Sequence, residues 1–197
     1  MVNKVSKNEN VKTCILRNQK IELIGLARAE IKLELEKLNL QDFRLSQIWN
    51  WVYRFGVKDF QKMQNLSKPL RTKLNEVFEI SRLKVSKKLI SNDGTVKWLL
   101  KLEDGNEIET VWIPEPGRGT LCISSQIGCT LTCKFCHTGT QRLVRNLKSS
   151  EIVGQVMLAM DYLDDWPSSR ENRILLSGFF LSELQSIPHK ICITRTS

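Results

Sequence analysis

The feature that most constrains this chain is a set of three closely spaced cysteines, Cys129, Cys133 and Cys136, in a C-x3-C-x2-C pattern. They follow the apolar run 120–123, which predicts the end of a buried strand. A short turn after a strand can gather thiolates around one soft metal centre. Four thiolates would close an iron–sulfur cluster, whereas three leave one iron with an open coordination position. The pattern therefore predicts a metal site at which a reaction can take place.

Other interpretations fit the same cysteines. Residues 133–137 match the C-x-x-C-H pattern of haem c attachment, and His137 with the three cysteines could form a structural Cys3His zinc site. A disulfide framework is a further alternative. Haem c and disulfides both need export, and the polar N-terminus has no signal-peptide pattern. Spacing alone leaves zinc as the main alternative, although His137 directly follows Cys136 and a tetrahedral site would be awkward.

The sequence around the cysteines resembles the radical S-adenosylmethionine (SAM) superfamily, and within it the RlmN family of adenine-C2 RNA methyltransferases. Residues 121–129 before the loop, and residues 145–147 and 150–156 after it, carry the resemblance, which extends from about Ile21 to Leu163. In that family an electron from a [4Fe–4S] cluster cleaves SAM to a 5′-deoxyadenosyl radical. The methyl group reaches C2 of an adenine in large-subunit ribosomal RNA or in tRNA.

The resemblance also implies roles for individual residues. Cys129, Cys133 and Cys136 would be the three cluster ligands, and the fourth iron would bind SAM. Cys122 matches the family cysteine that pairs transiently with a methyl-carrying cysteine, and its thiolate would be the reactive form. Glu109 matches the acidic residue assigned as the proton acceptor.

Each of these residues also has a simpler interpretation. A cysteine in a buried strand is commonly just a core residue, as Cys122 could be. Glu109 could be a partly exposed strand residue that pairs with a lysine. We assign no role to Cys14, Cys192 or His189 on sequence alone, and His137 is expected near the cluster rather than on it.

The charge of the chain is uneven. The net charge is +9, and residues 1–100 contain 20 Lys and Arg against 10 Asp and Glu. This excess predicts a polyanionic partner, and charge alone admits RNA, DNA or an anionic membrane. The family resemblance selects RNA and implies a reductant such as a flavodoxin or ferredoxin. With no apolar run of 18 residues and no export signal, we expect a cytoplasmic protein. We also expect it to be a monomer.

The predicted fold class is α/β. We expect a flexible arm over residues 1–20, a basic helical domain over 21–82, antiparallel linker strands over 83–116, the start of the barrel with the cluster loop over 117–172, and a divergent tail over 173–197. The resemblance implies that the strand, loop and helix of 117–172 are the first unit of a partial (β/α)6 radical SAM barrel.

Periodicity and turn residues predict the secondary structure. Helices are expected over 27–38 and 42–53, near 59–60, after Ser67, and over 149–163, with strands at 83–86, 96–102, 108–113 and 120–123. Trp49, Trp51 and Tyr53 have helical spacing, so we expect them in the core rather than stacked on nucleic-acid bases.

The resemblance stops at about residue 173. The family's Gly-Met-Gly-Glu-Pro motif for SAM is absent, and Cys192 does not match the context of the methyl-carrying cysteine. We therefore expect the N-terminal half of such an enzyme, inactive by itself, with a poorly ordered tail. The alternative is a non-catalytic RNA-binding remnant that retains an orphaned metal-binding loop.

Overall fold

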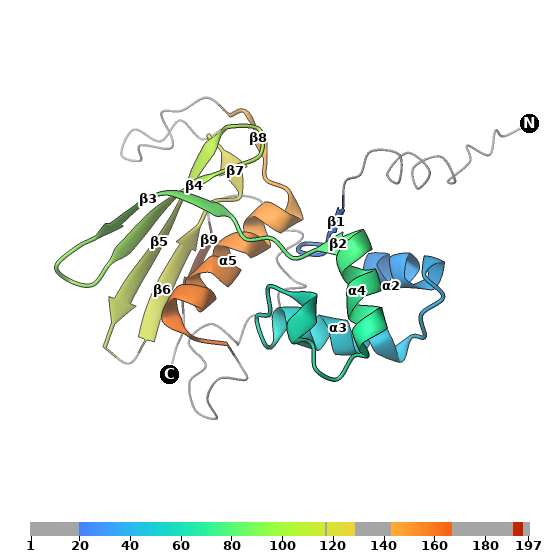
Figure 1. Cartoon of the computed structure of the whole chain (residues 1–197). Helices are drawn as coiled ribbons and strands as arrows, with labels where there is room; N and C mark the ends of the chain where they lie inside the picture. Colours follow the sequence, from blue (N-terminus) through green and yellow to red (C-terminus); the bar gives the residue numbers. More distant parts are fainter. Residues whose placement is uncertain (1–19, 117, 129–142, 167–190, 195–197) are drawn as a thin grey trace, which may run out of the picture.

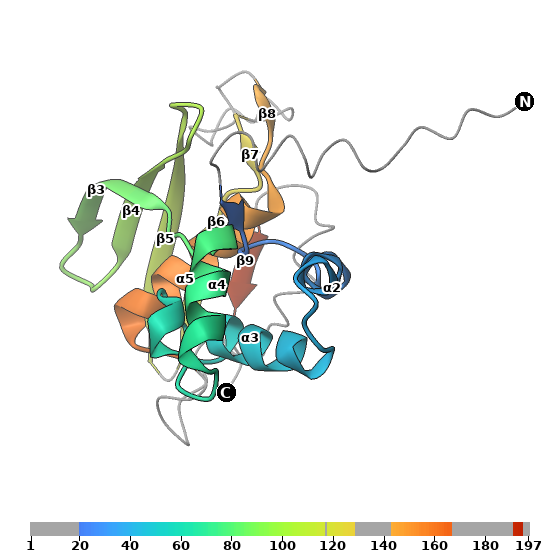
Figure 2. The same cartoon turned by 45° about the vertical axis from the view of Figure 1, so that its right-hand side comes forward.

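The computed structural model describes residues 20–116, 118–128, 143–166 and 191–194. Figures 1 and 2 show a group of helices beside a sheet, with one long helix, α5, between them. We call the first group the helical part. Within the described residues no helix has the length and apolarity that a membrane crossing needs.

The helical part contains three α-helices, a 3-10 turn and two short strands. These are β1 (Ile21–Glu22), α2 (Arg28–Lys37), α3 (Phe43–Tyr53), η1 (Phe60–Lys62), α4 (Lys68–Val77) and β2 (Phe78–Glu79), and β1 pairs with β2 in parallel. Each helix buries two apolar residues four positions apart, such as Ile31 and Leu35 in α2. This spacing places both on one face, so the predicted helices are confirmed within about two residues at each end.

The helix expected after Ser67 is α4, and its first turn lacks the usual capping bond. Ser67 occupies the N-cap position, with Pro69 in the first turn, but the Ser67 side chain makes no capping hydrogen bond. The start of α2 is capped in a different way. There the Glu30 carboxylate accepts the backbone N–H of the N-cap residue Ala27 at 2.6 Å. Of the three aromatic residues of α3 that were expected in the core, Tyr53 is buried, whereas Trp49 and Trp51 are only half-buried.

The sheet has five strands in the order β3-β4-β5-β6-β9, and every neighbouring pair is antiparallel. The strands are β3 (Lys84–Ile90), β4 (Val96–Lys101), β5 (Glu107–Glu115), β6 (Arg118–Ile123) and β9 (Ile191–Thr194). Gly94 and Gly105 have φ of +82° and +84° in the two turns, where glycine is favoured. Asn92-Asp93-Gly94 and residues 103–106, which contain residue types typical of turns, therefore connect β3 to β4 and β4 to β5.

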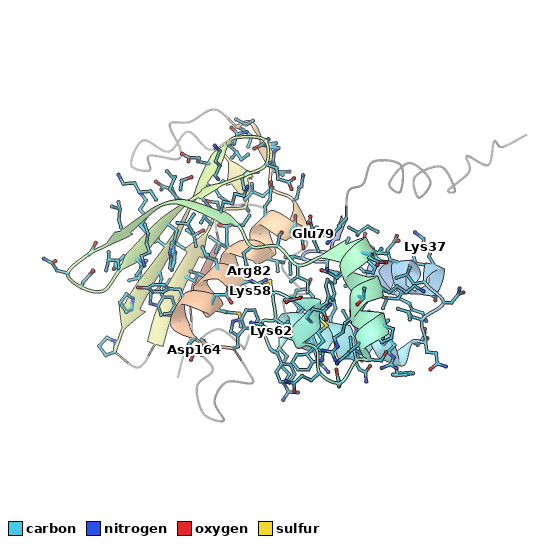
Figure 3. All side chains as sticks on the ribbon, viewed as in Figure 1. Lys37, Lys58, Lys62, Glu79, Arg82 and Asp164 are labelled. Atoms are coloured by element: carbon cyan, nitrogen blue, oxygen red, sulfur yellow. The ribbon has the colours of Figure 1, made fainter. Side chains whose placement is uncertain are left out.

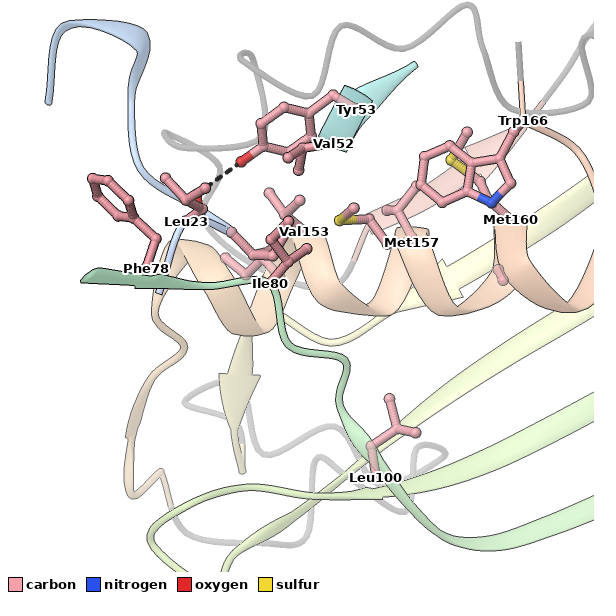
Figure 4. Packing of buried hydrophobic residues seen from close by; sticks show 14 of the residues in the cluster. Leu23, Val52, Tyr53, Phe78, Ile80, Leu100, Val153, Met157, Met160 and Trp166 are labelled. Atoms are coloured by element: carbon pink, nitrogen blue, oxygen red, sulfur yellow. Dashed lines mark hydrogen bonds between the residues drawn. The ribbon is translucent and has the colours of Figure 1, made fainter. Parts of the chain in front are cut away.

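Alternation along the strands gives the sheet two different faces. Along β4, Trp98 and Leu100 are fully buried, whereas the alternating residues Lys97 and Leu99 are half-buried. Leu121 of β6 is also fully buried. The buried face packs against α5 (Ser149–Leu163), whose residues 151–157 are all buried. The long helix is thus covered by the sheet on one side and by the helical part on the other, as Figure 4 shows.

The helical part is fixed to α5 by apolar and charged contacts. Figure 4 shows Leu23, Val52 and Ile80 facing Val153 and Met157 of α5. A charged cluster lies at the same junction, where Lys58 and Arg82 lie close together (Figure 3). Both side chains bind the same carboxylate oxygen of Asp161, at 2.8 and 2.9 Å.

The structure differs from the expected architecture in the tail and, over the described residues, leaves the barrel incomplete. The order strand, loop, helix is present as β6, residues 124–148 and α5, but within the described residues β6 has only antiparallel neighbours, so the barrel stays a prediction. No strand was expected in the tail, yet residues 191–194 form β9. The run Ile191-Cys192-Ile193-Thr194 has high β propensity, and β6 offers it a free edge.

Candidate active site

The loop with the three cysteines begins and ends at a narrow neck formed by β7 (Gln126–Ile127) and β8 (Arg145–Asn146). The two strands pair antiparallel, and Val144 N–H donates to the Ile127 carbonyl at 2.9 Å. Leu147 N–H donates to Ser125 O at 2.9 Å, which extends the pairing. The neck, a two-stranded sheet of its own, therefore holds the residues before and after the loop side by side.

The predicted cluster ligands Cys129, Cys133 and Cys136, together with His137, lie in residues 129–142, outside the described residues. In the part of the chain that is described, no group of three or more His, Cys, Asp or Glu side chains could hold a metal ion. The assignment of the three cysteines therefore still rests on their spacing and on the donor chemistry of thiolates.

Arg145 ties the neck to the start of α5. Its guanidinium donates to both carboxylate oxygens of Glu151 at 2.8 Å, and to Asp104 in the β4–β5 turn at 2.8 Å. Glu151 also accepts the Lys148 N–H at 2.7 Å, so it caps α5. Burial alone would raise the pKa of Glu151, but the bonds from Arg145 and Lys148 outweigh it and lower the pKa. The same guanidinium lowers the pKa of Asp104.

Gln155 joins α5 to both strands that carry predicted site residues. Its amide is fully buried, and its oxygen accepts the Thr110 hydroxyl and the Ser124 N–H, each at 2.8 Å. Its amide nitrogen donates to Ser124 O at 2.8 Å and to Glu151 O at 3.1 Å. Ser124 lies between Cys122 and the neck, so Gln155 fixes the backbone that leads from β6 into the loop.

Glu109 and Cys122 lie on the same face of the sheet, opposite α5. Cys122 pairs with Val111 across β5 and β6, and Glu109 is two residues before Val111 on the same strand. Diagonal neighbours of this kind are about 7–8 Å apart. The Ser124 hydroxyl also donates to the Glu109 carbonyl at 2.8 Å, which holds the ends of the two strands together. The structure thus brings these two predicted residues onto one surface.

Glu109 is half-exposed and forms an ion pair with a lysine. Its carboxylate lies 2.6 Å from the Lys97 ammonium, and the two side chains are 40% and 43% exposed. This is the geometry that the simpler interpretation of Glu109 expects. A carboxylate that water and a cation can reach is equally placed to accept a proton from a bound substrate.

Cys122 is also half-buried rather than part of the core. Its Cα partner in the neighbouring strand β9 is Cys192, to which we had assigned no role. A thiol that solvent can partly reach is able to react, whereas one in a closed core is not.

Sequence reasoning missed three residues that shape this site: Lys97, Arg145 and Gln155. The signals were present but weak. Ser149-Ser150-Glu151 is a helix-start pattern, and Gln155 is a polar residue on the apolar side of a predicted helix. Neither signal identifies the binding partners. Thr110 and Ser124, which bind Gln155, and Asp104, which binds Arg145, are distant in sequence.

A separate cavity of about 880 Å³ lies between the helical part and the start of α5. Its walls include Glu22, Arg82, Lys84, Lys101 and Lys148, so it carries both signs of charge. Neither Glu109 nor Cys122 lines it, and we do not assign it to the candidate active site.

Comparison with known proteins shows relatives for both parts of the chain. Residues 21–80 match the family described as the ribosomal RNA large subunit methyltransferase N-terminal domain. The dual-specificity RNA methyltransferase RlmN of Rhodospirillum rubrum is 52% identical over 161 residues, which cover 82% of this chain and 38% of that protein. The protein of the same name from Zymomonas mobilis is 52% identical over 163 residues, covering 81% of this chain and 42% of that protein.

A solved structure gives a matching result. The crystal structure of a radical SAM methyltransferase from Sphaerobacter thermophilus superposes with a TM-score of 0.65 at 36% identity, and covers 73% of this chain and 42% of that one. The chain thus spans about two fifths of the length of the relatives that it matches. Since identity of about one half extends over about four fifths of the chain, it belongs to the RlmN family of RNA methyltransferases.

Proposed function

We propose that this chain carries the RNA-binding and cluster-binding part of a radical SAM methyltransferase that places a methyl group on C2 of adenosine in 23S rRNA and tRNA. The observation that carries the proposal is the shared face of Glu109 and Cys122, on the strands that lead through Ser124 to the three-cysteine loop. In this proposal the proton acceptor and the reactive thiol lie on one face of the sheet, on the strands that lead towards the metal-binding loop.

Cys129, Cys133 and Cys136 are the proposed ligands of a [4Fe–4S] cluster, because three thiolates in one loop fit iron and leave a corner for SAM. When bound, the cluster and SAM supply the radical chemistry that the inert C2 position requires. The neck and Arg145 hold the loop ends in place. Cys122 would provide a thiolate beside the loop, and the Glu109 carboxylate would take up a proton from the substrate.

Ten basic residues on the helical part support RNA as the partner. They are Arg28, Lys32, Lys37, Arg44, Arg54, Lys58, Lys62, Lys68, Arg71 and Lys73. Such a surface attracts phosphates over several ångströms and makes binding salt-dependent. A target adenine would have to leave its stack to reach the face with Glu109. A flavodoxin or ferredoxin as reductant, a monomeric state and a cytoplasmic location complete the proposal.

We further propose that β6, the cysteine loop and α5 form the first unit of a partial (β/α)6 barrel. The support is their chain order and their likeness to a radical SAM methyltransferase. In this arrangement the remaining strands of a complete enzyme would enclose the face that carries Glu109 and Cys122, opposite α5.

Anaerobic reconstitution with iron and sulfide tests the cluster. We expect a brown protein with about four irons and an electron paramagnetic resonance signal, which is lost in Cys129→Ser, Cys133→Ser or Cys136→Ser. Cys122→Ser is the matched control and should keep the iron. A colourless protein that holds zinc tightly would overturn the proposal. SAM cleavage and 2-methyladenosine formation are then assayed on the reconstituted chain.

A second candidate is a non-catalytic RNA-binding module. The Lys97–Glu109 ion pair favours it, because this is the expected state of a carboxylate without a chemical role. The reconstitution experiment separates the two candidates: SAM cleavage by the chain would exclude the second, and salt-dependent RNA binding without any cluster would favour it.

A further inference from the structure

The face of the sheet opposite α5 carries a strip of lysines next to Glu109. We call it the lysine face and define it by Lys87, Lys97, Leu99 and Glu109. Lys87 pairs with Leu99 across β3 and β4, and Leu99 pairs with Glu109 across β4 and β5. Because directly paired residues point to the same side, Lys87, Leu99 and Glu109 form one row, with Lys97 diagonal to Glu109.

The strands that contribute these lysines are strongly basic and exposed. Residues 84–101 contain five lysines and a single acidic residue, Asp93. Every residue of β3 is exposed, and β3 is an edge strand of the sheet. Leu89, which is 50% exposed, pairs with Lys97 across β3 and β4 and so lies on the same face. Cations with interspersed apolar side chains suit a nucleic-acid backbone and its sugars.

The contact between Lys97 and Glu109 is close but easily exchanged. Both side chains are about two fifths exposed, and such half-exposed ion pairs contribute little free energy. A phosphate offers Lys97 equivalent oxygen acceptors and a similar charge. A phosphate at this position could therefore replace the carboxylate at small cost.

We propose that the lysine face binds the RNA backbone next to the target nucleotide, and that Lys97 exchanges Glu109 for a phosphate oxygen when RNA binds. The inference rests on the proposed function, since it places RNA at the Glu109 and Cys122 face. The exchange has a chemical consequence. It frees the Glu109 carboxylate from its contact with Lys97 at the moment when substrate is present, so that both carboxylate oxygens are open to the substrate.

The competing explanation is that lysines on β3 only prevent edge-to-edge pairing of sheets. Two adjacent lysines distinguish the explanations. Lys87 belongs to the lysine face, whereas Lys88 points to the other side, where its ammonium lies 4.7 Å from the centre of the Tyr162 ring of α5. An anti-aggregation role needs both equally, but an RNA role needs only Lys87.

The first test measures binding of the full chain to a fluorescent anticodon stem-loop RNA as salt is raised. Lys87→Gln and Lys97→Gln should each weaken binding several-fold and lower the slope of log K against log salt by about 0.7 to 0.9. Lys88→Gln is the matched control and should leave both quantities unchanged. Equal effects of Lys87→Gln and Lys88→Gln, or no effect of either, would overturn the inference.

The second test isolates the exchange at Lys97. Glu109→Gln should strengthen RNA binding more than Glu107→Gln, which removes the same charge from the same strand face without releasing Lys97. In a Lys97→Gln background the two substitutions should become equivalent. A persistent excess effect of Glu109→Gln in that background would disprove the exchange.

The outcomes also separate this inference from the proposed function. If the chain binds RNA and assembles its cluster, but all lysine variants bind alike, only the lysine face is wrong. If no iron–sulfur cluster forms with any preparation, the proposed chemistry fails, whatever the lysine variants do.

Discussion

At the scale of single residues, the site depends most on Arg145, because one guanidinium joins three parts of the chain. It binds the buried carboxylate of Glu151 at the start of α5 and Asp104 in the β4–β5 turn, and it belongs to β8 at the loop neck. Loss of this side chain would leave Glu151 ionised and largely buried without its cation. A buried carboxylate that has lost both its hydration and its cation destabilises the folded state.

We therefore expect Arg145→Gln to lower the free energy of unfolding by about 2 kcal/mol, less than for a fully buried pair because Arg145 is 29% exposed. Urea denaturation measures this change. Lys148→Gln is the control, since the pair of Lys148 with Glu103 is 62% and 90% exposed and should contribute less than about 0.5 kcal/mol. Equal losses in the two variants would contradict the role of Arg145.

The same residues predict a pH dependence. The folded-state pKa values of Glu151 and Asp104 are lowered, so their stabilising contribution is complete above their unfolded values, near pH 4, and is lost as pH falls through the lower folded values. Burial raises the pKa of Glu22, which acts in the opposite direction as pH rises. Urea midpoints between pH 7 and pH 3 should fall in the wild type and fall less steeply in Arg145→Gln.

At the scale of elements, α5 is positioned by contacts at both ends and by Gln155 in its first half. Gly56 lies against Trp166 after the C-terminal end of the helix, and Gly25 lies against Ser150 at its start. A Cβ added at either glycine would lie within 2.2 Å of these neighbours. The helical part therefore approaches α5 through two residues that have no side chain.

Gly56→Ala should lower the free energy of unfolding by about 2–4 kcal/mol, because the new Cβ would lie 2.1 Å from the Trp166 ring and φ is +64°. Gly105→Ala is a matched control: φ is +84°, but nothing lies within 4 Å of the added atom. It should show only the backbone strain of about 1 kcal/mol. Thermal or urea denaturation compares the two, and equal losses would show that the contact with Trp166 does not matter.

Gln155→Leu should destabilise the protein by about 2–4 kcal/mol, because it leaves the Thr110 hydroxyl and both backbone polar groups of Ser124 without their buried partner. Thr110→Val removes only one of these bonds and should cost about 1 kcal/mol. Hydrogen exchange at the Ser124 amide provides the local measurement. Exchange that stays slow in Gln155→Leu would contradict the proposed role at the loop entrance.

At the scale of the whole molecule, the helical part and the sheet share one long helix and so should unfold together. Asp161 on α5 is central to this coupling, since it accepts from Lys58, Arg82 and Trp166. Arg82 also donates to Gly56 O at 3.0 Å, and its side chain is only 12% exposed. Removing the Asp161 charge would leave a mostly buried cation without its carboxylate.

Asp161→Asn should therefore lower the free energy of unfolding by about 2 kcal/mol and broaden or split the urea transition, as the helical part unfolds before the sheet. Lys58→Gln is the control, because Lys58 is 57% exposed and its loss should change stability by less than about 0.5 kcal/mol. A single sharp transition in Asp161→Asn, at the wild-type midpoint, would show that the apolar contacts alone couple the two parts.

Much of the secondary structure follows from local pattern. The spacing of apolar residues predicted α2, α3, α4 and α5, and alternation between turn residues predicted β3 to β6. Each of these signals lies within a few consecutive residues. The two-residue strands at the neck and β9 were not predicted. All of them pair with partners that are distant in sequence; the neck strands have only two residues each, and the β propensity of residues 191–194 does not identify β6 as the partner.

The sequence by itself determined the cysteine spacing, the basic first half, the helices and the family, since all of these are properties of residues close together in the chain. Tertiary structure alone decided that Glu109 and Cys122 share a face, that Lys97 pairs with Glu109, and that Gln155 and Arg145 fix the two ends of the cysteine loop. The reason is that strand register and the packing of α5 are set by the whole core. A shift of one residue in β5 would have turned Glu109 towards α5.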